Sequence, residues 1–162
     1  MIAHIREATC EDVLACYAIE AACFPPGEAA SQQNIRTRAT LFPAGFLVAE
    51  HEGKIIGFVN SGASNQDDLA DEALKDMVGH DSAGRNLIVF SVAVRPAMQA
   101  QGVATQLLRA FIEQARRLGK ESILLLCKAH LVGFYERAGF RDEGLSNSLH
   151  GGARWHQMRL KL

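Results

Sequence analysis

The segment from Gln99 to Ala104 combines small residues with a position at which an anion can bind. It lies between an apolar run, residues 86–94, and a helical pattern that begins near Val103. The first N–H groups of a helix have no partner within the helix, and the helix dipole gives them partial positive charge. Gly102 and Ala104 are small enough to let a phosphate group approach the main chain. The segment therefore predicts a phosphate site, and the alternative is an ordinary strand-to-helix turn.

Other patterns that would place a cofactor or a metal do not occur in the sequence. It contains neither the GxxxxGK(S/T) pattern of phosphate-binding loops nor the GxGxxG pattern of dinucleotide-binding folds. The six histidines follow no HxxxH or HxH spacing, so we expect no metal site. The four cysteines form no CxxC pair and lack the density of a disulfide scaffold, which predicts reduced thiols.

Composition and charge are typical of one soluble domain. The chain has 162 residues, with 17 Lys and Arg against 18 Asp and Glu and a formal net charge of -1. This length fits a single domain, residues 1–162, and the near-neutral charge argues against a nucleic-acid partner or an anionic membrane surface. Charged residues stand where a signal peptide would have its apolar stretch, and no run of roughly 18 apolar residues occurs. We therefore expect a cytoplasmic protein, a monomer or a homodimer, without a membrane partner.

The first part of the chain predicts a strand and two helices. Residues 2–7 alternate in polarity like a strand, and Thr9 and Asp12 resemble a capping box at the start of a helix. The apolar stripe expected for this helix consists of Val13, Leu14, Tyr17, Ala18 and Ala21. The helix should end at residues 24–27, where two prolines and a glycine follow, and a second helix is expected over residues 31–41.

Residues 45–50 and 54–60 predict a β-hairpin, because they are short apolar runs with a turn between them. The next connection, residues 64–85, is long and polar, with a short helical pattern at residues 68–77. Long connections of this kind tend to be functional covers. We therefore expect this connection and residues 24–31 to form walls of the binding site.

The second half predicts a strand, a helix and a strand that form a parallel crossover. Residues 86–94 and 122–127 are continuously apolar, as strands buried on both faces are. The helix between them has an apolar face of Val103, Leu107, Leu108, Phe111, Ala115 and Leu118. Such a crossover is right-handed by rule. A short helix over residues 131–138 and two closing strands, from Phe140 and over residues 155–162, complete a mixed α/β fold.

Two motifs in these elements resemble those of the GCN5-related N-acetyltransferases (GNAT family). Residues 99–104 match the family's (R/Q)xxGx(G/A) signature, and residues 134–140, FYERAGF, match its FYxxxGF segment. The run LCKAHLVGFY, residues 126–135, is similar to the arylalkylamine (serotonin) N-acetyltransferase branch in particular. The resemblance implies the family's α/β (α+β) fold. This is a mixed, mostly antiparallel sheet of six to seven strands, with the parallel crossover at its centre and helices on both faces.

The resemblance also implies acetyl-CoA as the co-substrate and assigns residues to it. The pyrophosphate would lie on the strand-to-helix turn, formed by Gln99, Ala100, Gln101, Gly102, Val103, Ala104 and Thr105. In the family the fourth and fifth strands separate, and the pantetheine arm pairs with the free edge of the fourth like an added strand. That edge would be Val92, Ala93 and Val94, and Phe134 joins the cofactor-binding residues. An N–H group near Val92 would polarise the thioester carbonyl.

Tyr135 matches the family tyrosine that acts as general acid toward the departing thiolate of CoA. A thiol has a pKa of about 8.5 and a phenol one of about 10, so Tyr135 would donate a hydrogen bond readily and a full proton less readily. We expect a helpful residue that is not indispensable. The alternative is a tyrosine that packs its ring beside Phe134 and Leu131.

The acceptor amine needs a base, because an alkylamine with a pKa of about 10.4 is only about one part in 10³ neutral at pH 7. The arylalkylamine branch places two histidines on the fourth strand, whereas Ile88 and Phe90 occupy the matching positions here. Glu28 is a candidate general base, and Glu50 is a second one. For each, the alternative is a glutamate that only contacts solvent.

Three further residues lie near the expected site. His130 is a candidate for catalysis, and the alternatives are a helix cap or a surface residue. Cys127 is expected to pack, because direct attack by the amine needs no acyl-cysteine. Lys128 stands where many family members have an asparagine that hydrogen-bonds the pantetheine, so we expect it to meet a CoA phosphate or solvent.

The sequence thus predicts an enzyme, an acetyl-CoA-dependent N-acetyltransferase in which a small primary amine attacks the thioester directly. One alternative is an acyl-CoA-binding sensor or interaction module that has lost catalysis, favoured by the replacement of the two histidines. Another is an acetyltransferase for protein N-termini or lysines, and the long cover segments argue against it.

Overall fold

The computed structural model of the chain describes residues 1–69 and 72–162. Its longer elements are β1 His4–Glu7, α1 Val13–Cys23, α2 Gln32–Leu41, β2 Phe46–His51, β3 Lys54–Ser64, β4 Asn86–Val94, α3 Val103–Arg117, β5 Ser122–Cys127, α4 Val132–Arg137, β6 Arg141–Leu145 and β7 His156–Lys161. Short 3₁₀ turns are η1 Cys10–Asp12, η2 Pro43–Gly45, η3 Ala73–Asp76, η4 Pro96–Met98, η5 Ala129–Leu131 and η6 His150–Gly152. Within the described residues, no helix is both long and apolar enough to cross a membrane.

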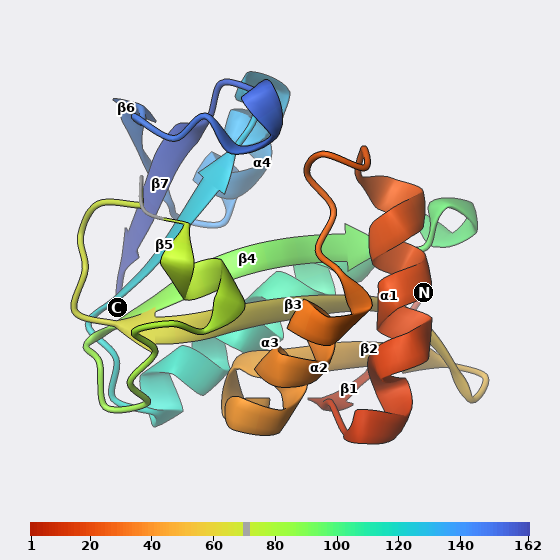
Figure 1. The fold of residues 1–162 in the computed structure, drawn as a ribbon. Helices are drawn as coiled ribbons and strands as arrows, with labels where there is room; N and C mark the ends of the chain where they lie inside the picture. The colour runs from red at the N-terminus through yellow and green to blue at the C-terminus, as the bar shows by residue number, and fades with distance from the viewer. Residues whose placement is uncertain (70–71) are drawn as a thin grey trace.

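The strands form one seven-stranded sheet in the order β1-β2-β3-β4-β5-β7-β6. Strands β4 and β5 pair in parallel, and the other neighbours pair antiparallel. Helix α3 makes the crossover between the two parallel strands and lies behind the sheet in Figure 1. The predicted mixed sheet with a central parallel crossover is therefore confirmed.

Helices cover both faces of the sheet (Figure 1). On one face, Leu107 and Phe111 of α3 pack with Leu87 of β4 in a core that also contains residues of α4. On the other face, α1 and α2 pack on β2 and β3, with Cys16 and Ile35 fully buried. The two faces thus have separate apolar cores, as the fold class requires.

The apolar stripe predicted for α1 is wrong except at Val13. Leu14 and Tyr17 are 64% and 37% exposed, and the helix instead buries Val13, Cys16, Ile19 and Glu20. The sequence of α1, VLACYAIEAAC, is apolar or small almost all round, so its pattern does not fix which face turns inward. The buried face therefore contains a glutamate, Glu20, that the predicted stripe did not include.

The helix start and the hairpin agree with their sequence signals. The Asp12 carboxylate accepts a hydrogen bond from the Thr9 N–H at 2.8 Å, as in a capping box. The hairpin is confirmed, but β3 continues to Ser64, four residues further than expected. Of the helical pattern predicted at residues 68–77, the structure shows the turn η3, and residues 70–71 lie outside the described part.

The parallel strands separate partway along their length. Their pairing runs from Asn86 opposite Ser122 to Val89 opposite Leu125 and then stops. At the same level the register with β3 shifts, so that Phe90 is an extra, bulged residue of β4. From Phe90 onward, β4 stays paired with β3 and has no described strand on its other side. The separation leaves room beside an unpaired strand edge.

Candidate active site

A cavity of about 890 Å³ lies where β4 and β5 separate. Its walls include the ends of both strands and the N-terminus of α3. Three further segments line it: the loop between α1 and α2, the connection between β3 and β4, and the loop between β6 and β7. The first two are the predicted walls, and the third was not expected.

The strand-to-helix turn has the conformation that an anion cradle needs. Ala100 and Gly102 have left-handed φ angles of 60° and 84°, and Gly102 directly precedes α3. Six of the seven predicted cradle residues line the cavity, and Gln101 does not. The Gln99 side chain donates a hydrogen bond to the Val94 carbonyl at 3.0 Å, so this side chain holds the turn itself. The main-chain N–H groups of the first turn of α3 therefore remain the anion donors.

The free edge of β4 lines the cavity with Val92, Ala93 and Val94, and Phe134 lies on the opposite wall. The Val94 carbonyl accepts from the Cys23 thiol at 3.2 Å as well as from Gln99. This carbonyl is already satisfied, and the register directs the main-chain groups of Ala93 toward β3, so Val92 offers the better main-chain contacts for an extended, amide-containing arm. The turn and this edge together fit an acyl-CoA.

Tyr135 lies in the cavity wall and is only 7% exposed. Its ring packs edge-on against Phe134 and Phe140. Burial, and secondarily the nearby Cys127 thiol, raise the pKa of Tyr135 above its ordinary value, which keeps the hydroxyl protonated. In the described part of the chain, no group hydrogen-bonds this hydroxyl, which leaves it available to a ligand.

Cys127 is 2% exposed, and burial raises the pKa of its thiol to about 11. At neutral pH the residue is a thiol, and the thiolate is the nucleophilic form. The geometry therefore favours the packing role predicted for Cys127.

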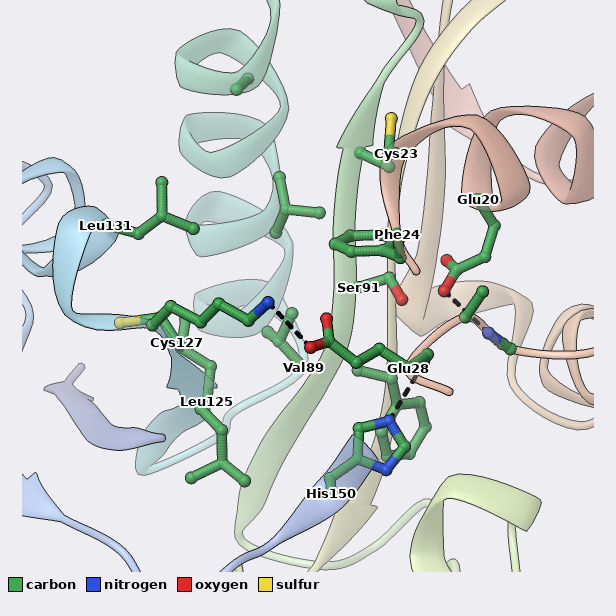
Figure 2. Close-up of a pocket in the computed structure, with 18 of the residues that line it drawn as sticks. Glu20, Cys23, Phe24, Glu28, Val89, Ser91, Leu125, Cys127, Leu131 and His150 are labelled. Atoms are coloured by element: carbon green, nitrogen blue, oxygen red, sulfur yellow. Dashed lines mark hydrogen bonds and ion pairs between the residues drawn. The ribbon is translucent and has the colours of Figure 1, made fainter. Parts of the chain in front are cut away.

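Glu28 enters the cavity and ion-pairs with Lys128 at 2.7 Å between Oε1 and Nζ (Figure 2). Its side chain is 8% exposed, and its Oε2 atom has no hydrogen-bond partner among the described residues. Lys128 also lies over the Trp155 ring, 5.6 Å from its centroid. The Lys128 side chain is 36% exposed, so it meets solvent as well as Glu28, and its contact with a CoA phosphate stays a prediction.

The remaining candidates from the sequence divide between the cavity and the surface. Ile88, Phe90 and His130 line the cavity, and His130 is exposed at its edge. Glu50 is not a cavity residue, and its carboxylate pairs with Arg6 at 2.8 Å. The structure therefore removes Glu50 as a candidate base, because a strand-end ion pair holds it away from the cavity.

His150 joins the covering segments to one another. Its Nε2 atom lies 3.0 Å from the Glu28 carbonyl, and its Nδ1 atom lies 2.5 Å from the Glu72 carboxylate. Its own carbonyl accepts from the Trp155 indole at 2.9 Å. One residue of the third segment thus connects the two predicted walls, and no local sequence signal indicates it.

Glu20 is a cavity residue that sequence reasoning missed. It is 2% exposed, its Oε2 atom accepts from the Ala30 N–H at 2.9 Å, and its Oε1 atom has no partner among the described residues. Burial raises the pKa of Glu20, although the Ala30 N–H and the Ser91 hydroxyl favour its ionised form. Glu20 lies seven residues after Val13, on the same face of α1. A prediction of the buried face that started from Val13 at this spacing would have included it.

Arg38 and Lys75 are two further cavity residues without a sequence signal. Arg38 is 2% exposed and lies over the Phe90 ring, 4.5 Å from its centroid. Burial lowers the pKa of Arg38 to about 10, and burial also lowers the pKa of Lys75. The cavity therefore holds buried charges of both signs away from the α3 turn.

Comparison with known protein families assigns the chain to a family. The model of the Acetyltransferase (GNAT) family matches residues 13–140, which include the turn, both separated strands and α4. The chain belongs to this family. The family match therefore confirms the resemblance at family level.

One curated relative matches part of the chain in sequence. The chain is 30% identical over 110 residues to a Bacillus subtilis (strain 168) protein named probable hydrolase YhcX; these residues are 64% of this chain and 21% of that protein. The chain thus spans about a fifth of the length of that curated relative.

Among solved structures, the loading GNATL domain of CurA from Lyngbya majuscula has a TM-score of 0.86 and 18% identity, with 99% of this chain and 98% of that one covered. The GphF GNAT-like decarboxylase, in complex with isobutyryl-CoA, has a TM-score of 0.83 and 23% identity, with 98% of each covered. YncA from Salmonella typhimurium, a putative acetyltransferase with its cofactor acetyl-CoA, has a TM-score of 0.72 and 21% identity, with 100% and 95% covered. These likenesses show the GNAT fold.

Proposed function

We propose that residues 1–162 form an acetyl-CoA-dependent N-acetyltransferase domain that acts on a small primary amine. The observation that carries the proposal is one continuous cavity. It begins at the α3 turn, follows the free edge of β4 and ends among buried carboxylates under three covering segments. The relatives that contain acetyl-CoA or isobutyryl-CoA support a CoA thioester as the ligand.

The first step is to hold the thioester. The N–H groups of Val103 and Ala104 face the pyrophosphate, while the main-chain groups of Val92 pair with an amide of the pantetheine arm. This pairing places the thioester near the point where β4 and β5 separate. An unused N–H group of β4 near Val92 then stabilises negative charge on the thioester oxygen, as an oxyanion hole does.

The bound thioester supplies an activated acetyl group, and the chain must supply a neutral amine. Removing the proton from the charged amine costs roughly 4 to 5 kcal/mol at pH 7 for a pKa of about 10.4. The free Oε2 atom of Glu28 is the proton acceptor that we assign to this step. Tyr135, protonated because its pKa is raised, donates a hydrogen bond to the departing thiolate.

The covering segments favour a small acceptor over a protein. His150 ties the α1–α2 loop to the β3–β4 connection over the cavity, so a peptide would have to displace these contacts. Membership of the arylalkylamine branch, suggested by residues 126–135, remains a prediction. Ile88 and Phe90 stand where that branch has two histidines, which argues against an aromatic amine as the acceptor. A cytoplasmic location is part of the proposal.

The proposal is tested with purified protein, acetyl-CoA and a panel of amino acids, alkylamines, arylalkylamines and lysine peptides. We expect calorimetry to show acetyl-CoA binding, and a thiol assay to show CoA release with at least one small amine. Binding without turnover on the whole panel would favour the sensor alternative. Turnover confined to peptides would favour a protein acetyltransferase, and no binding at all would refute the proposal.

A further inference from the structure

We propose that the acceptor is an amino acid, whose ammonium group is held by Glu20 and whose carboxylate is held by Arg38 and Lys75. This inference rests on the proposed function, since it names the acceptor class of the same site. It starts from three charged side chains in the cavity, Glu20, Arg38 and Lys75, whose hydrogen-bonding capacity is not filled by the residues that the structure describes.

Arg38 is a buried cation that makes no ion pair with a carboxylate among the described residues. Its Nε and Nη2 atoms donate to the Lys75 carbonyl at 3.3 and 3.1 Å, and Nη1 lies 3.5 Å from the Asn60 side-chain oxygen. Glu20 and Asp76 act on it electrostatically, yet within the described residues neither makes an ion pair with it. A guanidinium has five N–H donors in a planar fork that matches a carboxylate. Arg38 therefore retains donors in the cavity.

Lys75 supplies a second cation at the same end. Its carbonyl is the acceptor for Arg38, so the two residues are tied together, and both line the cavity. No hydrogen bond to its ammonium group occurs among the residues that the structure describes, and burial lowers its pKa. Glu72, Glu20 and Glu28 act on Lys75 electrostatically, yet among the described residues none of them makes an ion pair with it. Two neighbouring cations without an ion pair in the described part of the chain predict an anionic group in the ligand.

Glu20 supplies the opposite charge nearer the proposed thioester. Its Oε1 atom is buried and has no hydrogen-bond partner in the described part of the chain, and the Ser91 hydroxyl favours the ionised form of the same carboxylate. Figure 2 shows Glu20 and Ser91 directed into the same part of the cavity as Glu28. Because Ser91 precedes Val92, an ammonium group held by Glu20 lies beside the proposed oxyanion donor. The nucleophilic nitrogen belongs at this position.

Charges of both signs beside neighbouring residues of β4 define the class of acceptor. Glu20 interacts with Ser91, and Arg38 lies over Phe90, the preceding residue of β4. A simple amine would leave Arg38 and Lys75 unpaired, whereas an amino acid satisfies both ends.

The test compares each standard L-amino acid with its carboxamide and with its decarboxylated amine. Binding is measured by calorimetry on protein saturated with CoA, and turnover is measured by CoA release from acetyl-CoA. We expect at least one amino acid to exceed both of its analogues by roughly 100-fold in affinity and in kcat/KM, as loss of a charged, bidentate contact predicts. An amide or amine that is used equally well would overturn the inference and leave the proposed function standing. Binding of an amino acid without acetylation of any amine would support the site and refute the function; failure of every amino acid to bind would refute the site.

Variants locate the selectivity. Lys75→Met removes the ammonium group of a half-buried residue in the short turn η3, and Arg38→Gln removes the guanidinium group of a fully buried residue of α2. Both should raise KM for the amino acid by roughly 10- to 100-fold and leave KM for its amide unchanged. Arg36→Met, an exposed residue of the same helix α2, is the matched control and should change neither. If Arg38→Gln does not fold, Lys75→Met decides; equal effects of Lys75→Met on acid and amide would overturn the inference.

Discussion

The Glu28 carboxylate and the Lys128 ammonium group meet at 2.7 Å beside the gap between β4 and β5. Glu28 belongs to a covering loop, and Lys128 directly follows β5, so the ion pair attaches the cover to the edge of the proposed thioester site. One oxygen of Glu28 makes this contact, and the other, which is buried, has no hydrogen-bond partner among the residues that the structure describes. The pair thus positions the proposed base while leaving it an atom with which to accept a proton.

Glu28→Gln tests this base directly. It should lower kcat by roughly 10²- to 10⁴-fold, because an amide cannot take the proton of the amine. Lys128→Met is the matched control, since it keeps the carboxylate, and it should lower kcat far less. Steady-state kinetics with both substrates varied will separate kcat from KM. An unchanged kcat in Glu28→Gln would assign the base elsewhere.

Tyr135→Phe should lower kcat by about 10-fold and leave the affinity for acetyl-CoA nearly unchanged, because only the hydroxyl is removed. The raised pKa of Tyr135 has a further consequence for the pH profile. A group that works protonated is lost only as pH rises through its pKa, so any fall in kcat caused by Tyr135 must lie above pH 10 or so. A wild-type rate in the variant would mean that the residue only packs against its aromatic neighbours.

The α3 turn is tested by substituting two glycines that have the same left-handed backbone conformation. Gly102 and Gly119 have φ angles of 84° and 72°, and each stands at one end of α3. Gly102→Val and Gly119→Val should each cost about 1 to 2 kcal/mol of stability, because a side chain is strained in this conformation. Acetyl-CoA affinity should fall only in Gly102→Val, which calorimetry will measure. Equal affinities in the two variants would place the phosphate site elsewhere.

Glu20 links the site to stability. Its pKa is raised by burial, so the folded state favours the protonated form. The ionised form therefore costs stability as pH rises from about 4.3, the unfolded value, through the folded-state pKa. Glu20→Gln resembles the protonated form and should be more stable than the wild type at pH 7, with the difference disappearing toward pH 4. Urea unfolding at several pH values will show this, with the exposed Glu11→Gln as control; a less stable Glu20→Gln at pH 7 would contradict it.

The fold was largely predictable because its centre depends on local patterns. The apolar runs at residues 86–94 and 122–127 and the amphipathic helix between them leave few alternatives to a parallel crossover. The α3 turn was predictable for the same reason, since its small residues are contiguous. The separation of β4 and β5 came from the family resemblance, because no feature of either strand alone marks where pairing stops.

The acceptor end of the site was much less predictable. Glu20 was missed because α1 is apolar or small on nearly every side, so its inward face depends on tertiary packing. Arg38 and Lys75 meet through a side chain and a carbonyl 37 residues apart. His150 reaches Glu28 over 122 residues. Contacts between segments so far apart in the chain depend on tertiary packing, and the local sequence does not determine their geometry.

A structure of the protein with bound CoA tests the central claim most directly. The account predicts that the pyrophosphate lies on the N–H groups at the start of α3 and that the sulfur lies between β4 and β5. There the sulfur would be within hydrogen-bond reach of the Tyr135 hydroxyl and on the same side as Glu28. CoA bound away from the gap between the two strands, or a sulfur remote from both residues, would contradict it.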